Sequence, residues 1–396
     1  MYTQNPVFIP GPTNMPEVLR RATDLPTIDH RSAAFADILQ PALAGVRKVV
    51  KSENAEIVVF PATGSGGWEA TITNLLSPGD KVLAARSGMF SHRWIDMCQR
   101  HGLQVDAVHS SWKQPLPLAE YEKRLVADKG HEIKAVLVTH NETATGVKSD
   151  VGAVRRLLDD ARHPALLLVD GVSSIASMDF RMDEWKIDAA ITGSQKGFML
   201  PVGLAILALS PKAMQATQSA KLHRAFFDIR EMAKAYPSSG YPYTPSVGLL
   251  NGLKVSTELL LEEGLDNVFK RHARIASGVR AAISAWGLHL YAQEASSYSD
   301  TVSAVETPEG FDATSIVTHA AQKYAVAFGA GLGDVAGRVF RIGHLGSMSD
   351  VMALSGIATA EMAMADLGLP IRLGSGVAAA QEVYRNTEAS PVRNAA

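Results

Sequence analysis

The chain has 396 residues, of which 46% are hydrophobic and 20% are charged, and its formal net charge is −2. This is enough apolar material for one large domain and one smaller one. The near-neutral charge excludes the strongly basic field of a nucleic-acid-binding protein, so we expect no nucleic-acid partner.

Several other classes are also disfavoured. Cys98 is the single cysteine, which rules out an internal disulfide framework and suits the reducing cytoplasm. The first ten residues lack the basic and apolar segments of a signal peptide, and the longest apolar runs, about ten residues, are too short to cross a bilayer. The twelve histidines form no recognisable ligand cluster, so we expect no metal. We therefore expect a cytoplasmic protein without a membrane segment.

In chain order, the first segment is rich in proline and glycine and predicts an extended arm over residues 1–20. From Glu56 onward, short apolar runs alternate with helical patterns such as residues 68–76 and 151–162. The apolar runs predict strands at residues 57–60, 81–85, 135–139, 165–169, 189–192 and 204–209. This alternation favours an α/β fold with a mostly parallel sheet covered by helices.

The second half of the chain has a different pattern. Turn-forming and aromatic residues at 236–246 predict a long ordered loop, and a helix follows over 247–286 with a break near Gly264. Further predicted elements are strands at 303–307 and 339–342, a helix at 313–324 and a last helix at 353–367. We expect a large domain over 21–259, a smaller α+β domain over 260–384, and a flexible polar tail over 385–396.

A glycine-rich segment, TGSGG at residues 63–67, follows the first predicted strand. Glycines let the backbone approach a phosphate, and the N-terminus of the next helix offers free N–H groups. The segment matches neither the Walker loop nor the dinucleotide motif G-x-G-x-x-G. An ordinary strand-to-helix turn is the alternative interpretation.

Two charged residues follow later strands. Asp170 comes directly after an apolar run, where a carboxylate can hold a pyridine nitrogen protonated, or alternatively cap a helix. Lys196 lies between two apolar runs. A desolvated lysine loses its proton readily and becomes a nucleophile that forms Schiff bases, whereas an exposed loop lysine would be inert.

Taken together, these features are more specific than any one of them. The carboxyl ends of parallel strands meet at one edge of a sheet, where such folds bind their ligands. A phosphate cradle, an acid and a lysine at that edge, in this order, predict a site for pyridoxal phosphate.

Further motifs carry a resemblance to a known family. They are PGPT at 10–13, DHRS at 29–32, SGMF at 87–90, THNETATG at 139–146, VDGVSS at 169–174, GSQK at 193–196, YPYTP at 241–245 and FRIGH at 340–344. With them, the chain resembles the class V aminotransferases of pyridoxal-phosphate fold type I, specifically the serine–, aspartate– and alanine–glyoxylate group. The resemblance implies a seven-stranded-type sheet sandwiched by helices in the large domain.

The resemblance also implies roles for residues around the cofactor. Lys196 would hold pyridoxal phosphate covalently, and Asp170 would pair with its ring nitrogen. Val172 would pack on the ring, and Phe90 would stack on it where several relatives have tryptophan. Thr143 would form a hydrogen bond on the ring-hydroxyl side. The phosphate would be bound by Ser65, Gly66, Gly67 and Gln195. The individual phosphate contacts are placed only to within a residue or two.

Substrate and partner roles follow in the same way. Arg341 would bind the substrate α-carboxylate, which suits its two-pronged guanidinium, and Gly11 on the arm would close over that carboxylate. Tyr241 and Thr244 would reach the phosphate of a neighbouring subunit, so the resemblance implies a homodimer.

The implied reaction is a ping-pong transfer of the amino group of serine, aspartate or alanine to glyoxylate, giving glycine and an oxo acid, with Lys196 as general base. The sequence leaves the donor open. The alternative is another enzyme of this fold, such as a lyase or a cysteine desulfurase. A desulfurase needs a reactive cysteine on a mobile loop, and Cys98 lies in a helical pattern instead.

Overall fold

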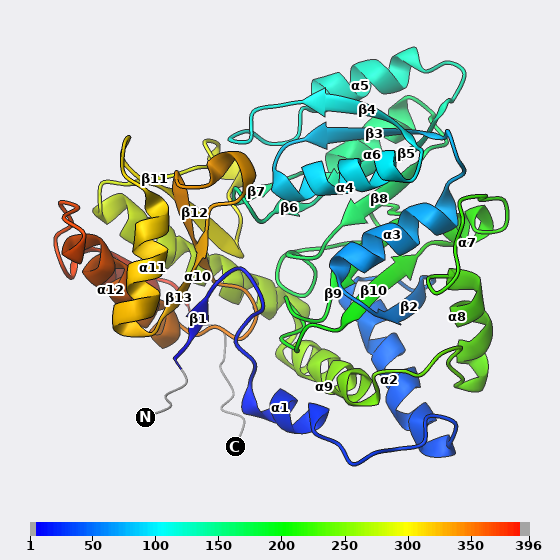
Figure 1. Ribbon diagram of the computed structural model, residues 1–396, viewed down its shortest axis with the longest axis horizontal. Coiled ribbons are helices and arrows are strands. Elements are labelled where there is room, and N and C mark those ends of the chain that lie inside the picture. The colour runs from blue at the N-terminus through cyan, green and yellow to red at the C-terminus, as the bar shows by residue number, and fades with distance from the viewer. Residues whose placement is uncertain (1–4, 389–396) are drawn as a thin grey trace.

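The protein was analysed as a computed structural model, which describes residues 5–388. The chain forms two bodies, each built on one sheet (Figure 1). The larger sheet has the order β2-β10-β9-β8-β5-β3-β4. Its strands are β2 (Glu56–Pro61), β3 (Lys81–Arg86), β4 (Gln104–His109), β5 (Ile133–Thr139), β8 (Leu166–Asp170), β9 (Ala189–Gly193) and β10 (Leu204–Leu209).

The larger sheet is mostly parallel, as expected. Only β10 runs antiparallel, against both β2 and β9. Every residue of β8, β9 and β10 is buried, and because successive side chains point to opposite faces, both faces of this part of the sheet are covered. The predicted fold class is confirmed. The seventh strand, β4, was not among the predicted strands because this edge strand carries Gln104, Asp106 and His109.

The large body contains nine α-helices among the described residues. They are α1 (Glu17–Thr23), α2 (Ala33–Val49), α3 (Gly64–Leu75), α4 (Met89–Arg100), α5 (Leu118–Ala127), α6 (Val151–Asp160), α7 (Pro211–Ala216), α8 (Ile229–Ala235) and α9 (Val247–Glu263). A short hairpin of β6 (Asn141–Glu142) and β7 (Val147–Lys148) follows β5. The predicted loop at 236–246 contains one 3₁₀ turn, Tyr236–Ser238, and no strand.

The smaller sheet has the order β1-β13-β14-β12-β11. Its strands are β1 (Val7–Phe8), β11 (His289–Leu290), β12 (Val302–Glu306), β13 (Ala327–Ala330) and β14 (Val339–Gly343), and its helices are α10 (Leu265–Ala285), α11 (Ala313–Tyr324), α12 (Asp350–Asp366) and α13 (Ser375–Asn386). β1 lies parallel to β13. The N-terminal arm is therefore part of this sheet at Val7–Phe8, and the buried Phe8 ring stacks on Phe328.

The prediction that residues 353–367 form the last helix is wrong, because α13 follows α12. Gly374, at φ 83°, precedes α13, and the Tyr384 hydroxyl donates to the carbonyl of Ile275 on α10 (3.0 Å). Packing on α10 stabilises a segment in which apolar and polar residues are mixed about equally. The predicted flexible tail lies partly in α13, and residues 389–396 are outside the described part of the chain.

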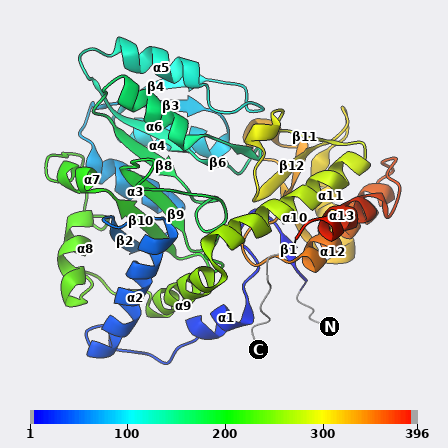
Figure 2. The ribbon, with the colours of Figure 1, turned by 180° about the vertical axis from the view of Figure 1, so that it is seen from behind.

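Helix α10 joins the two bodies, as its diagonal course in Figure 2 shows. The predicted break near Gly264 is confirmed, since α9 ends at Glu263 and α10 begins at Leu265. The core of the large body extends to Val268, and the core of the small body includes Ile275. Among residues 5–388, no helix combines the length and apolar character needed to cross a membrane.

Candidate active site

The candidate residues gather at one edge of the larger sheet. Asp170 ends β8, Gly193 ends β9, and the glycine-rich segment follows β2. These three strands run in the same direction, since β8 and β9 are parallel and both β2 and β9 lie antiparallel to β10. Their carboxyl ends therefore meet at the edge where a ligand is expected.

Helix α3 begins inside the glycine-rich segment, four residues earlier than the predicted helix. Its first backbone hydrogen bond runs from the Gly67 N–H to the Thr63 carbonyl (3.0 Å). The N–H groups of Gly64, Ser65 and Gly66 precede this bond and are free to bind an anion. A Cβ at Gly64 would lie 2.6 Å from Val172 Cγ2, so glycine is needed where α3 meets the loop after β8.

The Asp170 carboxyl is buried at the end of β8 and accepts a hydrogen bond from the Val172 N–H (2.9 Å). Burial raises its pKa to about 7, and the nearby Glu142 carboxyl adds to the increase. Residues 172–178 form turns and a bend rather than a helix, so Asp170 is not a helix cap. A carboxylate held here is stabilised by any positively charged partner that enters the site.

Lys196 is partly buried, unlike an exposed loop lysine. Its Nζ donates to the Pro10 carbonyl. Burial and the positive charge of Arg341 together lower the pKa of its ammonium to about 8, and Asp170 opposes both effects. Lys196 therefore loses its proton, and becomes nucleophilic, much closer to neutral pH than an ordinary lysine.

The N-terminal arm lies directly over Lys196. Gly11 has φ +108°, and a Cβ there would lie 2.5 Å from the Lys196 Cδ. The Thr13 N–H donates to the Gln195 carbonyl (3.2 Å), and the Thr13 hydroxyl donates to the Lys196 carbonyl (3.2 Å). The side-chain oxygen of Gln195 is buried and has no hydrogen-bond partner among the described residues. It is thus available to a ligand in this position.

Phe90 lies in the first turn of α4, and its ring packs edge-on against Trp68 (6.5 Å between centroids). The sequence analysis did not assign a role to the residue that holds this turn, which is Glu142. Its carboxylate accepts hydrogen bonds from the backbone N–H groups of Phe90 and Ser91 (3.1 Å each). The pairing of Gly88 with the buried Glu142 is visible only in the structure.

Thr143 belongs to a buried polar cluster between the two bodies. Its hydroxyl donates to the Ser173 Oγ (2.7 Å), and the Asn141 Nδ2 donates to both the Ser173 Oγ and the Thr301 Oγ1 (2.9 Å each). Thr301 precedes β12 of the small body. The cluster therefore ties the loop after β8 to the small sheet.

Arg341 lies on β14 and is 7% exposed. Its Nε donates to the Ala330 carbonyl (2.8 Å), and its Nη1 donates to the Thr143 carbonyl (3.0 Å). Burial lowers its pKa to about 10, and Glu142 opposes that change. Among residues 5–388 its Nη2 makes no hydrogen bond, so part of the guanidinium remains available to a carboxylate.

Tyr241 and Thr244 do not join this cluster within the chain. The Tyr241 hydroxyl donates to the Val59 carbonyl on β2, and Thr244 is exposed. Among the described residues, neither side chain hydrogen-bonds to another predicted site residue.

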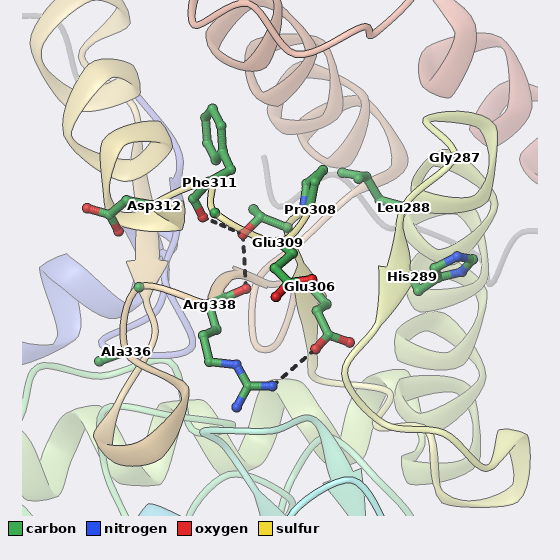
Figure 3. A pocket seen from close by; sticks show the side chains of 13 residues that line it. Gly287, Leu288, His289, Glu306, Pro308, Glu309, Phe311, Asp312, Ala336 and Arg338 are labelled. Atoms are coloured by element: carbon green, nitrogen blue, oxygen red, sulfur yellow. Dashed lines mark hydrogen bonds and ion pairs between the residues drawn. The ribbon is translucent and has the colours of Figure 1, made fainter.

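A large hollow lies elsewhere in the molecule. It has a volume of about 880 Å³ and is lined by loops of the small body, including Glu306 and Arg338, which form an ion pair of 3.4 Å (Figure 3). It contains none of the predicted site residues. The surroundings of Lys196 are closed by the arm instead.

Comparison with known proteins identifies the class to which this fold and site belong. The profile of the family described as "Aminotransferase class-V" matches residues 18–336. The chain belongs to this family, and the predicted recognition is confirmed. The partly buried lysine, the unpartnered Gln195 oxygen and the free N–H groups of α3 fit the family's cofactor, pyridoxal phosphate. The protein is a transaminase. Gly11 and Arg341 lie outside the matched region.

Individual relatives match over nearly the whole length. The L-aspartate–glyoxylate aminotransferase of Paracoccus denitrificans is 68% identical over 396 residues, which is 100% of both chains. The serine–glyoxylate aminotransferase of Hyphomicrobium methylovorum is 51% identical over 96% of this chain and 94% of its own. The crystal structure of the ureidoglycine–glyoxylate aminotransferase of Bacillus subtilis has a TM-score of 0.90 at 25% identity, covering 98% and 99% of the two chains.

Proposed function

We propose that the protein moves the amino group of a small L-amino acid to glyoxylate, giving glycine and the corresponding 2-oxo acid in a ping-pong cycle. The observation that carries this proposal is the partly buried Lys196, with its Nζ on the Pro10 carbonyl and its pKa lowered, beside Asp170 and Arg341. The names of relatives that align over nearly the full length support glyoxylate as the acceptor. Aspartate and serine are the favoured donors, and alanine is a third candidate.

We assign the cofactor contacts as follows. Asp170 would keep the ring nitrogen protonated, Val172 and Phe90 would pack on the two ring faces, and Thr143 would hydrogen-bond on the ring-hydroxyl side. Ser65, Gly66 and Gly67, with the Gln195 side chain, would hold the phosphate through the free N–H groups of Ser65 and Gly66, while Gly67 would line the cradle with its own N–H bonded to the Thr63 carbonyl. This assignment is supported by the position of α3 and by the buried Gln195 oxygen.

When bound, pyridoxal phosphate supplies a carbonyl for the amino group and a ring that takes up the electron pair left on the substrate Cα. The chain supplies the rest. Lys196 Nζ takes the Cα proton and returns it at the cofactor C4′, a task suited to an amine with a pKa of about 8. Arg341 orients the substrate through its carboxylate, and the arm at Gly11 excludes water.

A donor panel tests the substrate proposal. Serine, aspartate and alanine are each supplied with glyoxylate, and glycine formation is measured. We expect aspartate or serine to give the highest kcat/KM. If none of the three donors forms glycine from glyoxylate, the proposal is wrong. A strong preference for aspartate would require a second carboxylate-binding group, which the Arg31→Ala variant would examine, since Arg31 is exposed near the arm.

We further propose a homodimer in which Tyr241 and Thr244 reach the phosphate of the neighbouring subunit. The proposal is supported by the exposure of Thr244 and by the bond of the Tyr241 hydroxyl to the Val59 carbonyl rather than to a site residue of its own chain. Mixing Lys196→Ala subunits with Tyr241→Phe subunits tests it, because only a shared site allows one active centre of the mixed dimer to recover. Sedimentation of the mixture shows whether the dimer has formed.

We place the protein in the cytoplasm on the strength of its single cysteine, which is buried. The same residue bears on the alternative function of a lyase or cysteine desulfurase. Burial raises the pKa of the Cys98 thiol to about 12, so it is neutral and unreactive. Release of pyruvate or sulfide without an oxo-acid acceptor would support the alternative.

A further inference from the structure

A buried carboxylate outside the predicted site residues lies between the two halves of the site. Glu142, at the end of β6, is 2% exposed. Its oxygens accept hydrogen bonds from three backbone N–H groups, those of Phe90, Ser91 and Ala144 (3.1 Å each). Two of these donors belong to the first turn of α4, where a negative charge is favoured.

The surrounding backbone is shaped to admit this carboxylate. A Cβ at Gly88, the residue before α4, would lie 2.1 Å from Glu142 Cγ. The Glu142 carbonyl in turn accepts from the Gly146 N–H (2.9 Å) and closes the β6–β7 hairpin. One side chain therefore fixes the start of α4 and also the turn that contains Thr143.

Both of these segments reach the site. The start of α4 carries the Phe90 ring, and Thr143 carries the carbonyl that receives the Arg341 Nη1 (3.0 Å). The titratable groups that face Glu142 from the packed elements are Asp170 on β8 and Arg341 on β14. Glu142 thus connects the residue proposed to stack on the cofactor with the residue proposed to bind the substrate.

We propose that Glu142 is a positioning residue that fixes the positions of Phe90 and Arg341 relative to each other through backbone hydrogen bonds. It contacts neither substrate nor cofactor in this proposal. The inference rests on the roles proposed above for Phe90 and Arg341. It predicts that loss of the Glu142 charge weakens the binding of every substrate that carries an α-carboxylate, because Arg341 serves both half-reactions.

Burial of the Glu142 carboxyl also affects the stability of the protein, and the pH dependence of that stability provides a second readout. Burial raises the pKa of the Glu142 carboxyl, although the three N–H donors partly offset the increase. When a carboxyl group has a higher pKa in the native state than in the unfolded state, the native state loses stability as the pH rises above the ordinary, unfolded-state pKa. Glutamine at this position does not titrate. The variant Glu142→Gln should therefore gain stability relative to the wild type as the pH rises.

The test compares Glu142→Gln with a matched control, Glu361→Gln. Glu361 on α12 is also buried and also accepts three N–H donors, from Trp286 Nε1 (2.9 Å), Gly374 (2.8 Å) and Gly376. It lies in the small-body core and not at the site. KM and kcat are measured for donor and glyoxylate with the loaded enzyme, and urea unfolding is measured over a range of pH.

We expect Glu142→Gln to raise KM for both substrates at least about tenfold, and its stability relative to the wild type to increase with pH. Glu361→Gln should lose stability and keep the wild-type KM. A Glu142→Gln enzyme with unchanged KM, or with a stability difference independent of pH, would overturn the proposal. If that variant does not fold, Glu142→Asp replaces it, with a rise in KM expected because the carboxylate is one methylene too short to keep its bonds to the N–H groups of Phe90 and Ser91. Arg341→Lys is measured alongside, because an unchanged KM there contradicts the proposed clamp itself and not the role of Glu142.

Discussion

At the scale of single residues, the site depends on four ionisable groups, three of them buried and one, Lys196, partly buried. Asp170 and Glu142 are acids, Lys196 and Arg341 are bases, and their formal charges cancel. Burial shifts the pKa of each group toward its neutral form. Isolated charges in such surroundings are costly, and groups of opposite sign reduce that cost. The cluster therefore lowers the free energy of unfolding, and in exchange its groups gain or lose protons more readily near neutral pH.

The first prediction concerns the lysine in the cofactor-free protein. The pKa of Lys196 falls from 10.5 to about 8 on folding, so below pH 8 the native state carries the full cost of the buried ammonium. That cost disappears as the pH rises from 8 to above 10.5. Lys196→Met should therefore be more stable than the wild type at pH 7, on the order of 2 kcal/mol. Urea unfolding at several pH values checks this, and a variant less stable at pH 7 would show that the ammonium is well accommodated.

The second prediction concerns the acid. Asp170→Asn should lower kcat by roughly 10²-fold or more, because a preorganised charge at the ring nitrogen is lost. Asp188→Asn is the matched control, since Asp188 is also buried next to β8 and accepts the Leu167 N–H (2.8 Å) away from the site. Steady-state kinetics at saturating cofactor decide the point. An equal decrease of kcat in the two variants would show that Asp170 has no specific role in catalysis.

Single residues differ in how far the sequence could predict them. Lys196 and Asp170 were predicted because each follows a recognisable strand, and strand ends define the binding edge. Glu142 was quoted within a motif without a role, because its partners, the N–H groups of Phe90 and Ser91, lie about fifty residues away in the sequence. The contact of Lys196 with the Pro10 carbonyl was hidden for the same reason.

At the scale of elements, the N-terminal arm is the segment that closes the site. It is held at β1 by pairing with β13, and the Asn14 side chain both accepts from the Val7 N–H and donates to the Val7 carbonyl (2.9 Å each). Thr13 then connects the arm to Gln195 and Lys196. The arm is therefore anchored on both sides of Gly11.

The third prediction tests this closure. Gly11→Ala should reduce kcat/KM at least about tenfold, since the added Cβ meets the Lys196 side chain and φ +108° is unfavourable for alanine. Gly79→Ala controls for backbone strain alone, because Gly79 has φ +81° and open space around its Cβ position. Both variants are compared by kinetics and thermal unfolding. A Gly11→Ala enzyme that behaves like Gly79→Ala would mean that the arm does not approach the reacting groups.

Most elements were predictable because they contain apolar runs or amphipathic periods. The exceptions have physical causes. β4 is a polar edge strand, and α13 forms by packing on α10 rather than by a strong pattern of its own. The sequence predicts too late a start for α3 because glycine is a poor helix former, yet glycines occupy its first turn, where Gly64 lies close to Val172 and Gly67 lies close to Ile191.

At the scale of the whole molecule, two bodies meet across polar contacts as well as at α10. Lys113 of the large body donates to Glu306 on β12 (2.9 Å), which also pairs with Arg338 (3.4 Å) (Figure 3). The limits proposed for the domains, 21–259 and 260–384 with an arm over 1–20, stay a prediction. The division of the apolar core within α10 and the participation of Phe8 in the small-body core support two domains, with the arm shared between them.

The fourth prediction measures the contact between the bodies. In a double-mutant cycle of Lys113→Met and Glu306→Gln, the coupling free energy should be about 1 kcal/mol or less, because both side chains are partly exposed. The coupling should decrease with added salt. Urea unfolding of the four proteins gives the value. A coupling that is large and insensitive to salt would indicate a desolvated pair that controls how the bodies are held together.

The central claim is that Lys196 carries the cofactor and moves the proton. Borohydride reduction of the loaded protein, followed by peptide mass spectrometry, tests it most directly. We predict that the reduced cofactor is found on Lys196, and that Lys196→Ala binds no cofactor covalently and loses transamination by at least about 10³-fold. A label on another lysine, or a Lys196→Ala enzyme with wild-type turnover, would contradict the account.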